Sequence, residues 1–286
     1  YWKPHNFIDD APFNEDYFFS LLKKSILLRS NADVDIGSFL SGGIDSTTIS
    51  KVQHELGLEN NTFSVGYSDK KYDESHWFNL AANQYSSKHK TEILTPEDIE
   101  ESIDLSIDIF DEPYSDPSTV PSYMLSKKIS KYYKVAITGD GGDELLLGYD
   151  RIQQLLNQQK YPDTLISNIF NKYPPRLGSG NKVMSKSNNL KKAYTSYFSD
   201  KKLLEMLNIK DDFTFEEKFS SSIDGSLKGY MLAEYKFYLP EMMMLKVDRT
   251  SMASSLEARS PFVDHNLIEY VLSRNLNFLI NNPKLI

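Results

Sequence analysis

The chain has 286 residues, 40% of them hydrophobic and 25% charged, a composition typical of a globular protein with a sizeable core. Its 40 acidic and 32 basic residues give a formal net charge of -8, which argues against a protein that binds nucleic acid. It contains no cysteine, which excludes disulfides and thiol chemistry, and no signal peptide or membrane-length apolar run, so we expect a cytoplasmic protein that does not contact a membrane.

The first 150 residues alternate β-branched apolar segments with segments of helical periodicity. An entry helix is predicted over residues 18–29. Strands are predicted at residues 33–40, 61–67, 88–94 and 134–138. Helices are predicted between them at residues 47–56, 73–87, 95–110 and 122–133. Strands that alternate with helices are typical of a doubly wound parallel sheet, whose ligands lie at the carboxyl ends of the strands.

Two of these helices have recognisable starts. Thr95 is predicted to be an N-cap, because Pro96 follows at the first helical position and acidic residues fill the first turn. Asp73 is expected to cap the helix before it. Both starts place a helix directly before or after a predicted strand, as a doubly wound sheet requires.

The strand pattern fades beyond residue 150. Residues 151–225 mix helical pieces with polar loops, and the helical pattern returns from Ser226. Within residues 245–271 we expect one helix to carry Lys246, Asp248, Arg249, Glu257 and Arg259. We therefore expect one domain over residues 1–286. Its parts are an entry segment (1–32), an α/β part (33–150) and a mainly helical part (151–286).

The segment SGGIDS at residues 41–46 lies between a predicted strand and a predicted helix. Free backbone N–H groups at a helix N-terminus, together with the hydroxyls of Ser41, Ser46 and Thr47, favour an anion site. Gly42 and Gly43 let the backbone turn sharply and approach a phosphate. The Walker and dinucleotide glycine motifs are absent, which argues against a kinase or GTPase loop. A glycine pair by itself would favour an ordinary strand-to-helix turn.

Two further segments combine glycines or basic residues with carboxylates. ITGDGGDELLLGYDR at residues 137–151 contains Asp140, Asp143 and Glu144 at the end of a predicted strand. The carboxylate spacing does not fit an EF-hand calcium loop, so a tight polar turn is the structural alternative. LKVDRTSMASSLEARSPFVDHNLIEYV at residues 245–271 would, taken alone, also suit a salt-bridged helix face.

Together, these three segments resemble the synthetase domain of glutamine-dependent asparagine synthetases, members of the N-type ATP pyrophosphatases or PP-loop superfamily. The family patterns S-G-G-[ILV]-D-S, S-G-[DE]-G-x-D-E-x-x-x-G-Y and D-R-x-S-M-x-x-S-L-E-x-R-x-P-F-x-D occur in the same order along this chain. The resemblance implies an adenine nucleotide alpha hydrolase-like fold with ATP and Mg2+ as ligands.

Carried over position by position, the resemblance implies that Leu40 and Val65 flank the adenine and that Gly139 contacts the nucleotide. It implies metal ligation by Asp45 and Asp143, because Mg2+ prefers carboxylate oxygens. The residues implied to hold pyrophosphate and magnesium together are Ser41, Gly42, Gly43, Asp45 and Ser46.

The resemblance also implies a catalytic set. Asp140 falls where the family has an acidic residue near the acceptor site. Asp143 falls where the family has a carboxylate that binds magnesium or substrate. Arg249 occupies a cationic position that faces the phosphates. We expect Asp140 or Glu144 to remove a proton from ammonium. A cation and a metal suit this chemistry, because transfer of AMP to a carboxylate builds negative charge on the α-phosphate.

The chain departs from the family pattern at three points. It has neither the length nor the cysteine for the family's N-terminal glutaminase domain, so we expect that domain to be absent and ammonia to come from it in a longer protein or in trans. It also ends before the family's K-x-G-F stretch. Finally, no Arg lies between Asp111 and Ser126, where well-characterised asparagine synthetases bind the acceptor's α-carboxylate.

We therefore predict a ligase that adenylates a carboxylate, aspartate or another, and then lets ammonia displace AMP. One alternative is an amidotransferase of a surface-polysaccharide or other pathway that acts on a different acceptor. A second is a nucleotide-binding module without catalysis. A tRNA-modifying pyrophosphatase is disfavoured by the net charge of -8 and the lack of cysteine. Beyond the small substrates and the glutaminase domain, a homodimer is one arrangement left open.

Overall fold

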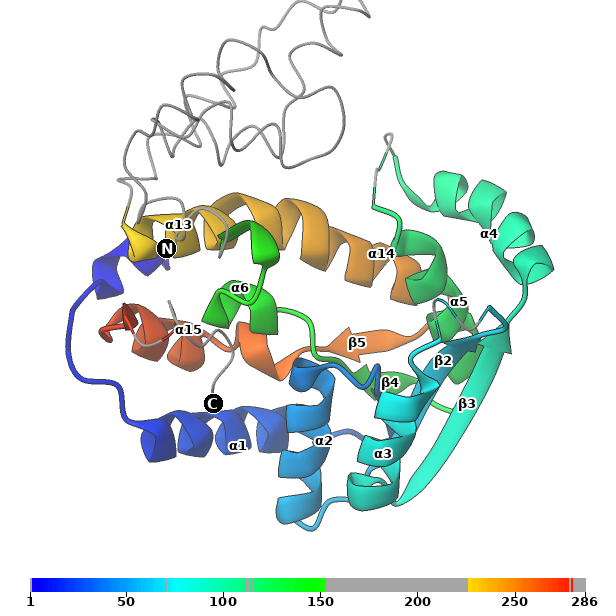
Figure 1. Cartoon of the computed structure of the whole chain (residues 1–286), viewed down its shortest axis with the longest axis horizontal. Helices are drawn as coiled ribbons and strands as arrows, with labels where there is room; N and C mark the ends of the chain where they lie inside the picture. Colours follow the sequence, from blue (N-terminus) through cyan, green and yellow to red (C-terminus); the bar gives the residue numbers. More distant parts are fainter. Residues whose placement is uncertain are drawn as a thin grey trace, which may run out of the picture.

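The computed structural model describes residues 2–69, 71, 73–111, 114, 116–152, 226–277 and 279. At the centre of these residues is a parallel five-stranded sheet in the order β3-β2-β1-β4-β5 (Figure 1). Its strands are β1 (Ile36–Phe39), β2 (Asn61–Tyr67), β3 (Lys88–Leu94), β4 (Val135–Ile137) and β5 (Glu257–Arg259). The α/β fold class expected from the sequence is thereby confirmed.

The strand order places a topological switch at β1. From β1 the chain winds outward through β2 to β3, and then returns to place β4 on the other side of β1. Ser38 of β1 lies beside Thr62 of β2 and Ile137 of β4, so the carboxyl ends of β1 and β4 are neighbours. Open α/β sheets bind ligands in the crevice outside such a point. The loops that follow β1 and β4 are therefore brought together.

Helices cover both faces of the sheet. Figure 1 shows α1, α2 and α3 on one side and α5 and α14 on the other. The helices of the first half are α1 (Glu15–Arg29), α2 (Ile44–Glu55), α3 (Ser75–Tyr85), α4 (Pro96–Ile109), α5 (Thr119–Ile129) and α6 (Gly142–Leu146). Those after residue 226 are α13 (Leu227–Ala233), the π-helix Glu234–Met244, α14 (Leu245–Met252) and α15 (His265–Leu272). Short 3-10 turns occupy Pro4–Phe7 and Pro261–Val263.

The largest hydrophobic core lies where the C-terminal helices pack against the entry helix. Phe18 and Leu22 of α1, Tyr230 of α13 and Leu267 of α15 are at most 1% exposed and belong to one cluster. The same cluster includes Ile137 of β4. Burying this apolar surface attaches the helical second half to the α/β part. None of the described helices combines the length and apolarity needed to cross a membrane.

Most predicted elements of the first half are confirmed, but four helices start at other residues than predicted: α1, α2 and α5 start three residues earlier, and α3 starts two residues later. The entry helix begins at Glu15, because the Asn14 side chain accepts a hydrogen bond from the Tyr17 amide and caps it there. Thr95 is the N-cap of α4, as predicted, and it forms a full capping box with Asp98. The prediction for Asp73 is wrong: its carboxylate accepts hydrogen bonds from Ser75, and the residue at the N-cap of α3 is Glu74.

The prediction of a single helix that carries five charged residues within 245–271 is also wrong. Helix α14 ends at Met252, and Ser255 adopts a left-handed conformation with φ 54°. The chain then runs into β5, so Glu257 and Arg259 lie on a strand that pairs with β4. The mixture of helices and loops expected over residues 151–225 lies outside the described residues, except for Arg151 and Ile152.

Candidate active site

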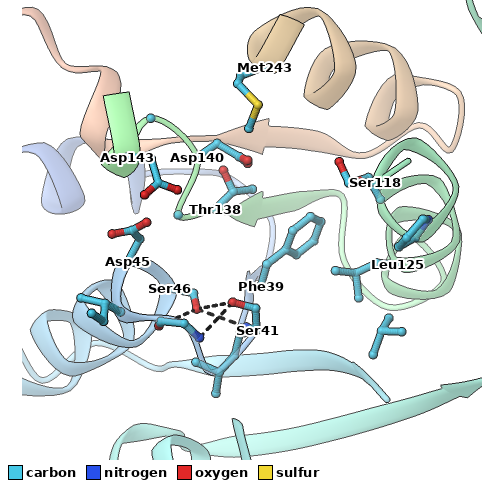
Figure 2. Close-up of a pocket in the computed structure, with 18 of the residues that line it drawn as sticks. Phe39, Ser41, Asp45, Ser46, Ser118, Leu125, Thr138, Asp140, Asp143 and Met243 are labelled. Atoms are coloured by element: carbon cyan, nitrogen blue, oxygen red, sulfur yellow. Dashed lines mark hydrogen bonds between the residues drawn. The ribbon is translucent and has the colours of Figure 1, made fainter. Parts of the chain in front are cut away.

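A cavity of about 440 Å³ opens at the carboxyl ends of β1, β2 and β4. The loop after β1, the loop after β4 and the start of α5 form its walls, and Met243 of the π-helix closes one side (Figure 2). This is the position that the sheet topology favours for a ligand.

The loop after β1 presents hydroxyl groups and a helix N-terminus to this cavity. Ser41 Oγ and Ser46 Oγ lie 2.9 Å apart, and Ser41 Oγ accepts a hydrogen bond of 3.2 Å from the Gly43 amide. Gly43 is the N-cap of α2, and no side chain caps the helix there. The first-turn amides of α2 and the positive end of its dipole therefore favour an anion.

Gly42 packs against α3, whereas Gly43 is the N-cap of α2. Its φ of 82° lies in the left-handed region, and a β-carbon there would lie 2.6 Å from the Phe78 amide nitrogen of α3. Only glycine combines this conformation with so close an approach. Gly42 therefore lets the loop pack on α3, and it does not border the cavity.

The loop after β4 packs directly on the start of α2. A β-carbon at Gly139 would lie 2.9 Å from the Ser46 amide nitrogen. Gly141, with φ 88°, turns the chain into the short helix α6. Figure 2 shows the Asp45 and Asp143 carboxylates facing each other across the gap between the two loops.

The Asp45 and Asp143 pair suits a hard cation. Within the described residues no group of three or more His, Cys, Asp or Glu side chains forms a complete metal site. Mg2+ commonly binds one or two carboxylates and takes its remaining oxygens from substrate phosphates and water. The pair therefore fits a magnesium ion that arrives with a nucleotide, and it does not fit a preformed protein cage.

Glu144 borders the cavity and belongs to a buried polar cluster. It is 1% exposed, and Tyr149 donates a hydrogen bond of 2.6 Å to its Oε1. Its buried Oε2 has no hydrogen-bond partner among the described residues. Burial raises the pKa of Glu144 to about 7. Behind it, the Arg151 guanidinium stacks on the rings of Tyr149 and Tyr238, at 3.8 and 4.1 Å from their centroids.

The described lining of the cavity is strongly acidic. It includes no Lys, Arg or His, and its five carboxylates are Asp45, Glu74, Asp140, Asp143 and Glu144. Burial raises the pKa of Asp140, and the nearby Lys246 ammonium opposes that shift. A polyanion such as a nucleoside triphosphate therefore needs cations as well as the helix N-terminus in order to bind here.

A sequence model of the family described as Asparagine synthase matches residues 18–284. The chain belongs to the asparagine synthase family. Its five-stranded parallel sheet and the two facing loops are consistent with the PP-loop architecture expected for that family.

Several curated proteins resemble this asparagine synthase family member at modest identity. Asparagine synthetase [glutamine-hydrolyzing] 1 of Bacillus subtilis is 27% identical over 255 residues, which cover 84% of this chain and 40% of the relative. Asparagine synthetase [glutamine-hydrolyzing] 3 of the same organism is 24% identical over 272 residues, covering 88% and 41%. Amidase chyE of Penicillium rubens is 23% identical, covering 95% and 48%. The chain thus spans less than half the length of these relatives.

The structure brings most of the predicted site residues of this family member together. Those that border the cavity are Leu40, Ser41, Gly43, Asp45, Ser46, Val65, Gly139, Asp140, Asp143 and Glu144. Gly42 and Arg249 do not border it. Arg249 is 40% exposed in its side chain and pairs with the exposed Asp111 at 2.5 Å. The roles of all these residues remain predictions.

Sequence reasoning missed that Lys246 is buried beside the cavity. The sequence pattern alone suits a charged helix face at Lys246, yet this residue is 5% exposed. Its Nζ donates hydrogen bonds to Ser118 Oγ at 2.7 Å and to Asp116 Oδ2 at 3.2 Å. Ser118 borders the cavity. The local sequence LKVDR does not distinguish a buried lysine from an exposed one, so the burial of Lys246 could not be predicted from it.

Proposed function

We propose that the chain carries out ATP-dependent amide formation on a carboxylate. The observation that carries the proposal is the meeting of two loops over one cavity: the uncapped N-terminus of α2, with Ser41 and Ser46, faces the carboxylates of the loop after β4. A phosphate site beside a metal-binding carboxylate pair is what cleavage of ATP between the α- and β-phosphates requires.

The proposed reaction has two displacements. A carboxylate oxygen of the acceptor attacks the α-phosphorus of ATP, and the bond from that phosphorus to the β-phosphate bridging oxygen breaks, which releases pyrophosphate. Ammonia then attacks the acyl carbon of the acyl-adenylate, and the bond from that carbon to the AMP oxygen breaks. The products are an amide, AMP and pyrophosphate. Neither step needs an enzyme nucleophile, which agrees with a chain that has no cysteine.

Asp45 and Asp143 are the residues proposed to hold Mg2+. When bound, the metal supplies positive charge that offsets the triphosphate and the leaving pyrophosphate. The described lining has no basic side chain of its own, so this charge is needed for ATP to enter an acidic cavity. Ser41, Ser46 and the first-turn amides of α2 then orient the pyrophosphate oxygens.

The proton that ammonium must lose passes to a carboxylate that borders the cavity. Asp140 and Glu144 are the two candidates, because both face the space between the loops. Glu144 also has a buried oxygen without a hydrogen-bond partner among the described residues, which leaves room for one N–H donor.

The acceptor is proposed to be a carboxylate, with aspartate the first to test. A different acceptor is the second candidate, and one observation favours it. No Arg lies between Asp111 and Ser126, and the described lining offers no cation for a second carboxylate. Two of the relatives are named glutamine-hydrolyzing and are more than twice as long as the matched region. We therefore propose that ammonia comes from a glutaminase domain, in the same protein or in trans, in the cytoplasm.

An oxygen-isotope experiment tests the acyl-adenylate. The acceptor carboxylate is labelled with ¹⁸O and incubated with the purified chain, Mg-ATP and ammonium chloride, and AMP is examined by mass spectrometry. The proposal requires one labelled oxygen in AMP for each amide formed, because the carboxylate oxygen leaves on the α-phosphate. Unlabelled AMP alongside amide would overturn this mechanism.

A further inference from the structure

Lys246 lies directly behind the wall of the cavity at the end opposite the phosphate loop. It projects from α14, which packs against α5 on the far face of the sheet. Its contacts reach the segment between α4 and α5, where Ser118 borders the cavity, and Met243 of the π-helix, which borders it too. Figure 2 shows Ser118 and Met243 on this side, with Asp140 between them and the phosphate loop.

The hydrogen bonds of Lys246 fix the position of Ser118. Lys246 Nζ donates to Ser118 Oγ at 2.7 Å, and Ser118 Oγ donates in turn to Asp116 Oδ1 at 2.6 Å. The Ser118 amide also donates to Asp116 Oδ1, at 2.8 Å. The hydroxyl is therefore held from both sides. It keeps one lone pair that is not used by these contacts and that can face the cavity.

A second contact holds the same segment in place. Tyr114 OH donates a hydrogen bond to the backbone carbonyl of Met242 in the π-helix. Of the described residues between α4 and α5, Tyr114 is thus tied to the π-helix, and Asp116 and Ser118 are tied to Lys246 of α14. Both attachments lie next to residues that border the cavity, Ser118 and Met243.

The charge of Lys246 matters because of what surrounds it. Asp116, 13% exposed in its side chain, pairs with it at 3.2 Å, and Asp140 lies close enough for its charge to be affected by the lysine. The described lining carries five carboxylates and no cation, so an acceptor carboxylate that enters this end meets negative charge. A buried ammonium group in a low-dielectric wall offsets that repulsion more strongly than an exposed one.

We propose that Lys246 is a positioning residue for the acceptor side of the reaction, in that it holds Ser118 at the cavity wall and supplies the positive charge that lets an acceptor carboxylate approach Asp140. This inference rests on the proposed function. It assigns a role that sequence reasoning did not give to Lys246, and it explains how an acceptor carboxylate is tolerated where no Arg is present between Asp111 and Ser126.

A purely structural ion pair would behave differently, and paired substitutions separate the two cases. Lys246→Met removes the charge and leaves Asp116 buried without its partner, so this variant is expected to lose stability. Lys246→Met combined with Asp116→Asn removes both charges and restores neutrality. Its melting temperature should return toward that of the wild type. If the lysine acts only through the ion pair, activity returns with stability.

The experiment measures acceptor-dependent AMP formation with Mg-ATP and ammonium for the wild type and the double variant. The expected result is a loss of about tenfold or more in kcat/KM for the acceptor, with the KM for ATP within about twofold of wild type. Lys246→Arg, which keeps the charge, should recover part of the loss. Lys228→Met, which removes a lysine paired with exposed Asp10 far from the cavity, is the matched control.

The outcomes distinguish the inference from the proposed function. A double variant with the acceptor kcat/KM of the wild type would overturn the role of Lys246 and leave the proposed function standing. If the double variant does not fold, Ser118→Ala takes its place: it keeps the ion pair and removes the hydroxyl, and an unchanged kcat/KM for the acceptor would overturn the inference. A wild type that forms no AMP with any carboxylate would overturn the proposed function and this inference with it.

Discussion

Gly142 lies against the carboxylate of Asp45: a β-carbon built at Gly142 would lie 2.6 Å from Asp45 Cγ. Asp45 lies in the first turn of α2 and Gly142 is the first residue of α6, and their contact limits where the Asp45 carboxylate can point. Glycine at position 142 therefore leaves the space in which this carboxylate faces Asp143 (Figure 2).

Gly142→Ala is expected to displace the Asp45 carboxylate, since a side-chain end can rotate away. The concentration of Mg2+ that gives half-maximal pyrophosphate release should rise, with little change in melting temperature. Gly139→Ala is the contrasting variant, because its β-carbon would meet the Ser46 backbone at 2.9 Å, which cannot rotate away, so it should destabilise the fold. Gly142→Ala with the magnesium dependence of the wild type would contradict the assignment of Asp45.

Asp45→Asn and Asp143→Asn are each expected to lower the rate of pyrophosphate release by roughly a hundredfold, because an amide binds Mg2+ far less well than a carboxylate. The rate is measured at a fixed ATP concentration over a series of magnesium concentrations. Asp10→Asn, at an exposed position on the N-terminal segment, is the control. An unimpaired rate in Asp45→Asn would remove that residue from the metal site.

The sequence was most informative where one local rule decides an element. The bounds of β2 and β3, predicted at residues 61–67 and 88–94, are confirmed. Thr95 was predicted as an N-cap from its own neighbours. Strand β5 was missed because its three residues, EAR, show no strand preference and depend on pairing with β4.

Buried ion pairs were beyond the reach of the sequence. Arg151 donates hydrogen bonds to both carboxylate oxygens of Glu234, and the closer pair of atoms is 2.7 Å apart. These residues are 83 positions apart, and their side chains are 14% and 1% exposed. Lys246 and Asp116 are likewise separated by 130 positions. Tertiary packing alone brings such partners together, whereas each residue looks like an ordinary surface charge in its local sequence.

Glu234→Gln is expected to lower the free energy of unfolding by about 3–5 kcal/mol, because it leaves a buried guanidinium without its carboxylate. Lys228→Met, which breaks a pair whose Asp10 is 77% exposed, should cost less than about 1 kcal/mol. Both values come from chemical denaturation at neutral pH. Equal losses of unfolding free energy in the two variants would contradict the claim that breaking the buried Arg151 and Glu234 pair costs more than breaking an exposed pair.

The ion pair between Arg29 and Asp264 is expected to make the free energy of unfolding fall at low pH. Burial alone would raise the pKa of Asp264, but hydrogen bonds from Asn266 and Arg29 hold this pKa below its ordinary value. A carboxyl with a lowered folded-state pKa contributes stability above its unfolded pKa of about 3.9, and this stability is lost as the pH falls through the folded pKa.

Asp264→Asn tests this contribution, since asparagine keeps the N-cap of α15 and loses the charge. The difference in unfolding free energy between wild type and variant should be largest near pH 6 to 7 and should shrink below about pH 4. A difference that stays constant from pH 7 to pH 3 would show that the ionised carboxylate contributes nothing.

Acceptor-dependent cleavage of ATP tests the account most directly. The purified chain is incubated with Mg-ATP, ammonium chloride and a panel of carboxylates that begins with aspartate, and AMP, pyrophosphate and amide are quantified together. The account predicts equal amounts of the three products with at least one carboxylate and almost none without it. Intact ATP with every carboxylate, or cleavage to ADP and phosphate, would contradict it.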